Sequence, residues 1–563
     1  MPPGGREAPP AAGGRGSAVP TGRGGAQDRE WYRGLPVPPN AAATFSRRAN
    51  TNYMETGILS SLQLTAQFPD VIVENFYIKT RNSIEEGKSK APFGFVIPVQ
   101  RDMTKAAELV RILRIQGIEV GQVASQIKLG DTTIPAGSHV IKRDQPYGRL
   151  AKNLLERQVY PDSRLTTYDD SGWTMGLTMM VEVKEIADPA ILKVPTTPVT
   201  TVTVKGKIVG AGTAGLAVAH YGSNNMIAFR YKLRAMPMRI AEKSFTAEGV
   251  EFPAGSFVIP GPVTASARGA VEELGLTAAA LSAVPTVPMH DAVAPRIAIY
   301  SQWTSTQDLG WYRLTFDRFT VPYDLIYKEQ VKQGNLRSKY DVILMAAQNI
   351  NRQVALQPPA ARPQPYQKSD KYQFLGAYGE TPDMSGGLGQ EGVDAIAKFL
   401  ETGGTLIAAG AAIRFPIEFG WARTVDVEAI TGVTAQRPII QAEVVRPEHP
   451  VFYGYADKTL AVKYVGGTVL RVGVADQGQI LGRYAGGDAS VLSGLMVGAD
   501  QLRQRAFAVD LPGAYNGKGR VILFANNPIY RWQNHGEFNL VFNSVLNWNY
   551  VPPPPPVTPA PPT

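Results

Sequence analysis

Histidine is the first residue type to consider for chemistry, because the 563-residue chain contains five histidines and no cysteine. A catalytic zinc ion is held by three protein groups, two of them commonly one helical turn apart, and by a water molecule. No histidine, aspartate or glutamate stands three or four places after His139, His220, His290, His449 or His535. The spacing therefore predicts no metal centre, and the missing cysteines exclude disulfides and thiolate nucleophiles.

A second group of candidate side chains lies near the C-terminus. Arg531, Asn534, His535 and Glu537 follow a segment, residues 520–525, that has the composition of a buried strand. Because the carboxyl ends of strands often border a ligand crevice, these four side chains are predicted to line one. The alternative is a cluster of hydrogen bonds that fixes the final helix, and the sequence leaves both interpretations open.

Residues 210–215 read Gly-Ala-Gly-Thr-Ala-Gly and match the dinucleotide-binding pattern GxGxxG. That pattern requires a helix directly after the glycines and an acidic residue about 20 positions later for the ribose. No aspartate or glutamate occurs between Gly215 and Glu242, and Asn224 and Asn225 interrupt any long helix. The sequence therefore predicts a turn between strands and no bound cofactor.

Two further positions lack the residues that catalysis would need. The strand predicted over residues 405–409 runs into residues 410–412, which are Gly-Ala-Ala, where hydrolases and amidotransferases carry a nucleophile. Asp169 and Asp170 are adjacent, so their carboxylates point apart and do not form the pair that a glycosidase uses. We interpret them as a capped turn that packs on Trp173.

The elements that must position these residues begin with two predicted helices, over residues 51–68 and 70–88. A short apolar strand follows at 93–98. Apolar residues at helical spacing then predict a helix that Gly117 ends, and a further strand is expected to start at Ile118.

A repeated segment follows this first region. Residues 134–141, Ile-Pro-Ala-Gly-Ser-His-Val-Ile, return 118 positions later as residues 252–259, Phe-Pro-Ala-Gly-Ser-Phe-Val-Ile. Pro-Ala-Gly-Ser before apolar residues is typical of a tight turn that leads into a strand. The order of the preceding elements also matches, which favours two related α/β modules over one common turn used twice.

The third region alternates strands and helices. Strands are predicted at residues 296–300, 340–346, 405–409 and 520–525, with helices between them, and such alternation implies a parallel sheet with helices on both faces. A β-rich stretch at about 438–510 and a final helix at 538–548 complete it. The fold class is therefore predicted to be α/β, with two small related modules before a parallel-sheet domain.

Composition limits the partners of the protein. The net charge is +9, but lysine and arginine are spread along the chain, which predicts no binding of nucleic acid. The chain has no apolar run of about 18 residues, so no membrane span is expected. The first 25 residues do not resemble an export signal, and the sequence leaves localisation open.

These signals predict six segments along the chain. They are a disordered Gly/Pro/Arg-rich segment (1–27), a helical segment (28–90), an α/β module (91–190), a second α/β module with the repeated turn (191–290), a larger α/β domain (295–550) and a proline-rich tail (551–563).

Several strings taken together resemble one family. They are Arg-Glu-Trp-Tyr-Arg at 29–33, Asn-Thr-Asn-Tyr-Met-Glu-Thr-Gly at 50–57, the stretch 94–98, Lys-Arg-Asp-Gln-Pro-Tyr at 142–147 and the stretch 168–173. In this order they look like the post-catalytic part of bacterial zinc carboxypeptidases of the carboxypeptidase A-like family. The third region, with Gly-Lys-Gly-Arg at 517–520, resembles the flavodoxin-type, class I amidotransferase-like domain at the end of those proteins.

The resemblance implies a front domain that this chain does not match. The family's front domain binds zinc through a His-x-x-Glu pair and a later histidine, and it releases C-terminal residues from peptides. None of the zinc ligands can be placed on this sequence, and Glu55 does not carry the family's catalytic glutamate motif. We therefore expect a chain that starts at an internal methionine, lacks most of the peptidase domain and binds no cofactor itself.

Two functions follow. In the first, the chain is the non-catalytic rear portion of a secreted or periplasmic metallocarboxypeptidase, with a peptide substrate or a peptidase domain as its partner. In the second, it is a free-standing module that binds a ligand or a protein and has an inactive amidotransferase-like domain. In the first case residues 28–90 would normally pack on the missing domain, so they are expected to expose apolar surface and to favour aggregation.

Overall fold

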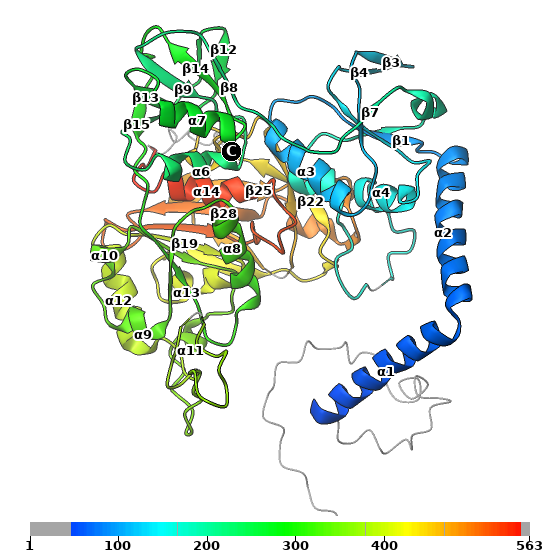
Figure 1. The fold of residues 1–563 in the computed structure, drawn as a ribbon. Helices are drawn as coiled ribbons and strands as arrows, with labels where there is room; N and C mark the ends of the chain where they lie inside the picture. Colours follow the sequence, from blue (N-terminus) through cyan, green and yellow to red (C-terminus); the bar gives the residue numbers. More distant parts are fainter. Residues whose placement is uncertain (1–46, 166, 378, 467, 553–563) are drawn as a thin grey trace, which may run out of the picture. The chain divides into compact units, whose positions relative to one another are not determined.

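The computed structural model describes residues 47–552 except 166, 378 and 467, and the chain divides into two compact units (Figure 1). The first unit is Met1–Lys79 and the second is Thr80–Thr563. The disorder predicted for residues 1–27 and nearly all of the predicted proline-rich tail fall outside the described residues. The protein combines helices with several sheets, some of them parallel, which confirms a mixed α/β fold.

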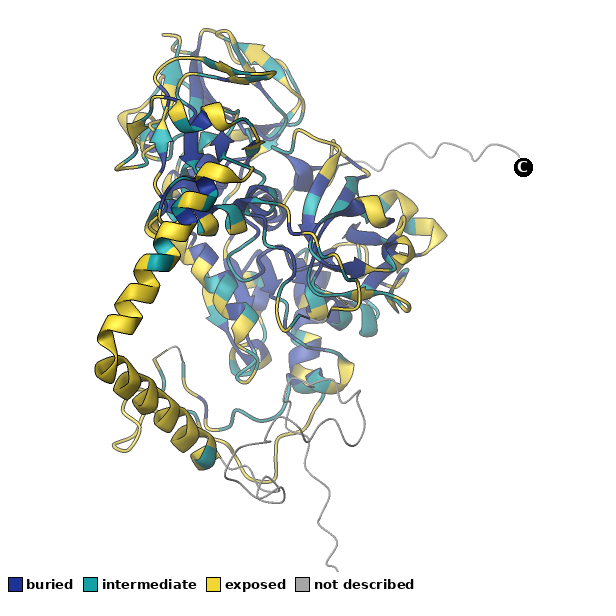
Figure 2. Ribbon diagram, turned by 90° about the vertical axis from the view of Figure 1, so that its right-hand side faces the viewer, coloured by how far each residue is buried: buried dark blue, intermediate teal, exposed yellow. Residues whose placement is uncertain are grey.

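Two helices account for the described part of the first unit. α1 (Arg47–Gln67) buries none of its 21 residues, and Figure 2 shows it exposed along its length. α2 (Pro69–Ser89) starts at a proline. Proline has no amide hydrogen, and this suits the first helical turn because amide hydrogens there have no partner within the helix. Both predicted helices are thereby confirmed. The last turn of α2 lies in the second unit, where Gly87 fits against the Arg143 carbonyl with no room for a Cβ atom.

The first small sheet has five antiparallel strands in the order β6-β1-β5-β2-β7. Strand β2 begins at Gly121 rather than at Ile118, so the predicted start is wrong by three residues. Strand β7 pairs with β2, so this sheet includes residues on both sides of the boundary predicted after residue 190. The elements of this region are β1 (Gly94–Ile97), α3 (Met103–Ile115), β2 (Gly121–Gln122), β3 (Ile127–Leu129), β4 (Thr132–Ile134), β5 (His139–Lys142), α4 (Gly148–Leu155), α5 (Met175–Met179), β6 (Lys184–Ile186) and β7 (Thr197–Pro198), of which β3 and β4 form a separate hairpin.

The second small sheet has the same arrangement, with one extra strand. Its order is β14-β9-β13-β10-β15, with β8 added in parallel beside β14 (Figure 1). Its elements are β8 (Lys207–Val209), β9 (Gly215–Val218), α6 (Asn225–Lys232), β10 (Arg239–Ala241), β11 (Phe245–Ala247), β12 (Val250–Phe252), β13 (Phe257–Pro260), α7 (Ala265–Glu273), β14 (Thr277–Leu281) and β15 (Met289–Asp291).

Strand register repeats between the two small sheets at the spacing found in the sequence. Gly121 pairs with Val140 in the first sheet, and Arg239 pairs with Val258 in the second, which adds 118 to both numbers. The β3–β4 and β11–β12 hairpins are related by the same offset. The central pairs β1–β5 and β9–β13 also correspond, but with another offset, because Ile97 pairs with His139 and Val218 with Phe257.

The GxGxxG segment joins β8 to β9, with no helix after it, as the sequence predicts. Its glycines serve close packing on β14, because a Cβ atom at Gly212 would lie 2.0 Å from the Leu281 carbonyl carbon. The amide of Gly212 donates to Ala280 and that of Ala214 to Leu281. These backbone contacts explain the glycine-rich pattern without a ligand.

The third region forms one large sheet with a parallel half and an antiparallel half. The parallel strands lie in the order β17-β16-β18-β19-β29, which in chain order is 2-1-3-4-5, a known order of doubly wound sheets. The bounds are β16 (Ile297–Tyr300), β17 (Asp324–Ile326), β18 (Val342–Met345), β19 (Thr405–Ala409) and β29 (Arg520–Phe524).

The antiparallel half continues from β29 through β28, β25, β22 and β23, and β20 pairs with β24. It confirms the β-rich stretch predicted at about 438–510. Its strands are β20 (Val425–Ala429), β22 (Ile439–Val444), β23 (Thr459–Lys463), β24 (Thr468–Val472), β25 (Ile480–Tyr484) and β28 (Ala506–Pro512), and the principal helices of the region are α8 (Gln307–Arg318), α12 (Gly389–Glu401) and α14 (Phe538–Leu546).

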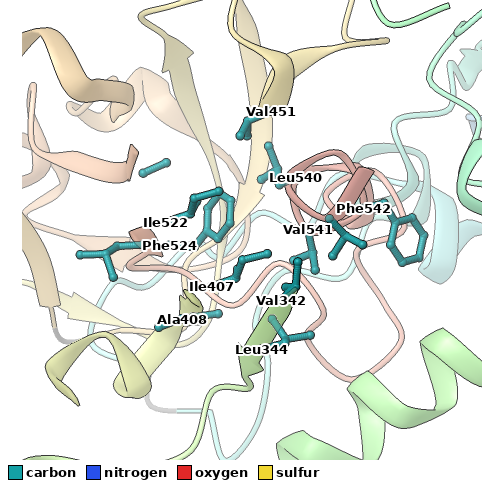
Figure 3. Close-up of a cluster of buried hydrophobic side chains, with 14 of the residues drawn as sticks. Val342, Leu344, Ile407, Ala408, Val451, Ile522, Phe524, Leu540, Val541 and Phe542 are labelled. Carbon is teal, nitrogen blue, oxygen red and sulfur yellow. The ribbon is translucent and has the colours of Figure 1, made fainter. Parts of the chain in front are cut away.

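The main core lies between the parallel strands and α14, whose nine residues are all buried. Figure 3 shows Val342, Ile407 and Ile522, from three neighbouring strands, beside Leu540 and Val541 of α14. Each fully buried side chain of this size contributes roughly 1.5–3 kcal/mol of transfer free energy. Because all nine residues are buried, the helix is covered on all faces.

The repeated turn offers a matched test of packing. Gly137 and Gly255 have the same left-handed backbone, with φ of 85° and 90°. A Cβ atom at Gly255 would lie 2.4 Å from that of Tyr453, whereas at Gly137 the nearest atom is 3.4 Å away. Gly137→Ala should cost about 1–2 kcal/mol from backbone strain, and Gly255→Ala roughly 1–3 kcal/mol more from overpacking. Urea unfolding of both variants measures the difference, and equal midpoints would contradict the packing of the second turn on Tyr453.

Candidate functional site

The four side chains predicted to line a crevice lie in the turns between β29 and α14, and they face different neighbours. Arg531 donates to Asp169 at 2.7 Å, while Asn534 donates to Glu537 at 2.9 Å. The ring of His535 lies beside Trp532 and bonds its carbonyl oxygen at 3.1 Å. The fold therefore brings Asn534 and Glu537 into contact and directs Arg531 and His535 elsewhere.

Glu537 is buried at the start of α14 with 1% of its surface exposed. Its carboxylate accepts hydrogen bonds from the Lys463 amide at 2.8 Å and from the side chains of Asn526 and Asn534. Burial raises the pKa of Glu537 to about 8, although these donors and the Lys463 charge oppose the shift. Near neutral pH the carboxyl group is therefore largely protonated, and all its polar partners are structural.

Lys463 and the acidic pair connect this cluster to an earlier turn. The Lys463 ammonium is buried, 3.1 Å from Asp170, and donates to the Gly172 carbonyl. Burial lowers the pKa of Lys463, and Asp170 opposes that change. Asp170 also accepts from Tyr530 at 3.0 Å. The turn at Asp169 and Asp170 thus binds cationic and hydroxyl groups of the third region, which the interpretation as a local capped turn did not include.

His535 is almost fully buried between two aromatic rings, with Trp532 and Phe538 centroids both 4.7 Å away. Burial lowers its pKa to about 4, so the imidazole is neutral at pH 7. Because a carbonyl oxygen only accepts, Nε2 must carry the proton that it donates to Trp532. A neutral imidazole of this kind is a weak base, and with Trp532 and Gln533 it lines a cavity of about 440 Å³.

A cavity lies elsewhere on the same sheet, at the carboxyl ends of β16 and β18. It has a volume of about 280 Å³ and is lined by Tyr300, Ser301, Gln302 and Trp303 after β16. In a 2-1-3-4-5 sheet the chain leaves β16 and β18 in opposite directions, which opens a crevice between their ends. We call this space the switch-point cavity.

Gln348 fixes the two loops that border the switch-point cavity. Its side-chain amide donates to the Tyr300 carbonyl at 2.9 Å, and its oxygen accepts from the Gln302 amide at 3.2 Å. The Trp303 ring, which also lines the cavity, stacks on Tyr327 at 3.8 Å and donates to Glu329 at 3.1 Å. Both contacts hold the wall in one conformation, which lowers the entropic cost of binding a ligand.

A loop over the other side of the cavity is held by one carboxylate. Asp383 accepts hydrogen bonds from the backbone amide of Gln364 and from both the backbone amide and the hydroxyl of Ser385. The Ser385 hydroxyl and these two amides lower the pKa of Asp383 to about 2. The Lys328 ammonium donates to the Ser385 carbonyl, so its charge is directed to this loop. The remaining lining groups are mostly amides and hydroxyls, including those of Gln357, Thr304 and Ser301.

The turn after β19 has the backbone of a nucleophile elbow but no space for a nucleophile. Gly410 has a left-handed φ of 55°, and a Cβ atom there would lie 2.8 Å from that of Ala347. The Gly410 amide donates to the Asn526 carbonyl at 3.0 Å. A side chain at this position would therefore clash with the loop after β18.

Potential metal ligands do not gather in the part of the chain that the structure describes. Within 47–552, apart from three positions, no group of three or more histidine, cysteine, aspartate or glutamate side chains is arranged to hold a metal ion. Over those same residues, no helix has both the length and the apolar character needed to cross a membrane.

Three asparagines that no motif in the sequence indicated join α14 to its surroundings, and they are here called the asparagine ladder (Asn539, Asn543 and Asn547). Asn539 donates to the Gly222 carbonyl at 2.7 Å, and Asn543 bonds the His220 ring at 3.0 Å. Asn547 bonds the His290 ring at 2.9 Å in the same way. Their spacing of four residues within an apolar helix was the signal available, because it places all three on one face.

No protein-family model matches this chain, and no curated protein matches it. Among solved structures, a putative ThuA-like protein from Bacteroides uniformis is 12% identical, with 45% of this chain and 89% of that chain covered and a TM-score of 0.26. A putative GMP synthase component from Thermoplasma acidophilum is 7% identical, with 45% and 93% covered and a TM-score of 0.26. A β-galactosidase from Bacillus circulans sp. alkalophilus is 10% identical, with 46% and 31% covered and a TM-score of 0.24. These scores are too low to carry an argument.

The raised pKa of Glu537 makes stability depend on pH. Between pH 4.5 and 8 the folded chain holds a proton that the unfolded chain has released, so stability falls as pH rises through this window. Glu537→Gln mimics the protonated acid, and should gain stability relative to wild type by up to about 1.4 kcal/mol for each pH unit. Urea unfolding at pH 6.5 and at pH 8 measures this change.

Glu537→Ala is the control, because it leaves three donors unpaired and should lower stability at both pH values by roughly 3 kcal/mol. If the free energies of unfolding of Glu537→Gln and wild type differ by the same amount at pH 6.5 and at pH 8, the raised pKa of Glu537 is contradicted.

Proposed function

We propose that this chain is a non-catalytic ligand-binding protein with two related α/β modules before a flavodoxin-type, amidotransferase-like domain. The offset of 118 residues that relates the β2–β5 pair to β10–β13, and the β3–β4 hairpin to β11–β12, supports the relation between the modules. The 2-1-3-4-5 order of the parallel strands supports the assignment of the last domain.

The switch-point cavity is the observation that carries the proposal. It lies where sheets of this order bind ligands, and Gln348, Glu329 and Asp383 hold its walls in place through hydrogen bonds. At about 280 Å³ it has room for a molecule of monosaccharide size.

The lining indicates the class of ligand. Amides and hydroxyls predominate, the Lys328 charge is directed to the Ser385 carbonyl, and the Trp303 ring offers a flat apolar surface. Such a lining suits a neutral molecule with several hydroxyl groups, which donates and accepts hydrogen bonds and places its C–H face on the ring. Gly410 and its contact with Ala347 support binding without covalent catalysis.

The test uses calorimetric titration of the full chain with a panel of neutral monosaccharides and with inositol. At least one should bind with saturation at one site. Gln357→Ala and Gln364→Ala remove side-chain amides that line the cavity, and each should weaken binding by roughly tenfold, or about 1.4 kcal/mol. Gln333→Ala, at an exposed position outside the cavity, should leave the affinity unchanged. Absence of binding across the panel, or equal affinity of all variants, would refute the proposal.

A second candidate function follows from the exposed helix α1. Ile58, Leu59, Leu62 and Leu64 are each more than half exposed, which is unusual for so many neighbouring apolar side chains. This exposure supports the role implied by the resemblance, in which the chain is the rear portion of a metallocarboxypeptidase-like protein and α1 packs on a peptidase domain. The zinc centre would belong to that domain.

If α1 is a packing surface, then Ile58→Ser combined with Leu62→Ser should reduce aggregation of the isolated chain. The expected readouts are less binding of a hydrophobic dye and a smaller aggregate fraction in light scattering, with unchanged urea unfolding of the second unit. Val474→Ser is the matched control, because Val474 is 93% exposed but outside α1, and it should change neither readout. Equal aggregation of the double variant and wild type would contradict this function.

A further inference from the structure

A second cavity, of about 430 Å³, lies where the two small sheets and the third region meet. Its wall includes Asp102 and Lys105 from the start of α3, Tyr221 and Gly222 from the loop after β9, and residues 454–457 and 459–461, which follow η5 (Pro450–Phe452) and begin β23. The loops at Gly222 and Gly454 approach so closely that a Cβ atom at Gly222 would lie 2.9 Å from the Gly454 carbonyl. The cavity is therefore bordered by parts that hold each other in position.

Asp102 and Lys105 place two opposite charges in this cavity. Their side chains are only 10% and 9% exposed, and the closest approach between their charged atoms is 4.0 Å, too long for a hydrogen bond. Asp102 Oδ1 caps α3 by accepting from Thr104, while Oδ2 is buried with no hydrogen-bond partner in the described residues. Burial lowers the pKa of Lys105, and Asp102 opposes that change.

A buried charge whose hydrogen bonds are incomplete is costly, so this pair is poised to bind a group that supplies them. The carboxylate needs a donor and the ammonium needs an acceptor, and the two lie side by side. A ligand with an ammonium and a carboxylate on one carbon atom presents the reverse pair of charges at similar spacing. The two dipoles would then lie antiparallel, which is their most favourable arrangement.

From this geometry we propose that the cavity binds a free α-amino acid with an apolar side chain, its carboxylate on Lys105 and its ammonium on Asp102. Glu182, Asp457 and Arg101 also line the cavity, and Arg101 is paired with Glu251. Leu177, Met180 and Leu460 line the same space and supply an apolar surface for the side chain. This site is separate from the switch-point cavity and does not depend on the function proposed for it.

The proposal is tested by calorimetric titration of the full chain with L-leucine, N-acetyl-L-leucine and L-leucinamide. L-Leucine should bind at one site, and each analogue, which lacks one of the two charges, should bind at least roughly tenfold more weakly. No saturable binding of L-leucine up to about 10 mM, or equal affinity for an analogue, would overturn the proposal.

Variants identify the residues. Lys105→Met keeps the aliphatic part of the side chain, and Asp102→Asn keeps the helix cap, so each should fold and lose at least about tenfold in affinity for L-leucine. Lys128→Met, at an exposed position on β3, removes a charge away from the cavity and should bind like wild type. Wild-type affinity in folded Lys105→Met or Asp102→Asn would place any binding elsewhere. If a variant fails to fold, the comparison of the three ligands on the wild-type chain still decides.

Discussion

The buried helix α14 is the element on which the second unit depends, because it is covered on every face and held at both ends. On one side its apolar residues pack on the parallel strands, and on another the asparagine ladder bonds His220, His290 and the Gly222 carbonyl of the second small sheet. A hydrogen bond contributes only about 1 kcal/mol, but an unpaired buried amide costs more, so the ladder permits one docking position. The asparagines therefore contribute more to the specific position of α14 than to the free energy of unfolding.

Ionisable residues secure the two ends of the same helix. At its start, Glu537 accepts from Asn534, Asn526 and the Lys463 amide. At its end, Arg520 donates to the carbonyls of Asn547, Trp548 and Tyr550, and Asp510 balances the Arg520 charge while also bonding His449. Arg520 thereby satisfies carbonyl groups at and just beyond the end of α14, where a helix leaves them unpaired. The partners of Glu537 lie outside the helix and join its start to β23 and to the loop after β29.

Local patterns were sufficient for most elements of the fold. Apolar spacing located α3, α8, α12 and α14, and the buried strand β19 was predicted with its observed bounds, because burial and helix geometry leave a periodic trace in the sequence. The repeated Pro-Ala-Gly-Ser turn occupies matching positions, before β5 in the first small sheet and before β13 in the second. The short strand β2 was misplaced, since two residues carry no period, and the 2-1-3-4-5 strand order leaves no local signal at all.

The sequence by itself determined the inventory of chemistry: no cysteine, no histidine at metal-ligand spacing, and a glycine at the elbow after β19. Only the tertiary structure decided which polar residues form hydrogen bonds within the fold and which face a cavity. Glu537 and Asp102 are both acidic residues beside the start of a helix, yet Glu537 meets three donors and Asp102 keeps one oxygen unpaired. The difference arises because hydrogen-bond satisfaction depends on partners that can lie far away along the chain, and no local pattern records them.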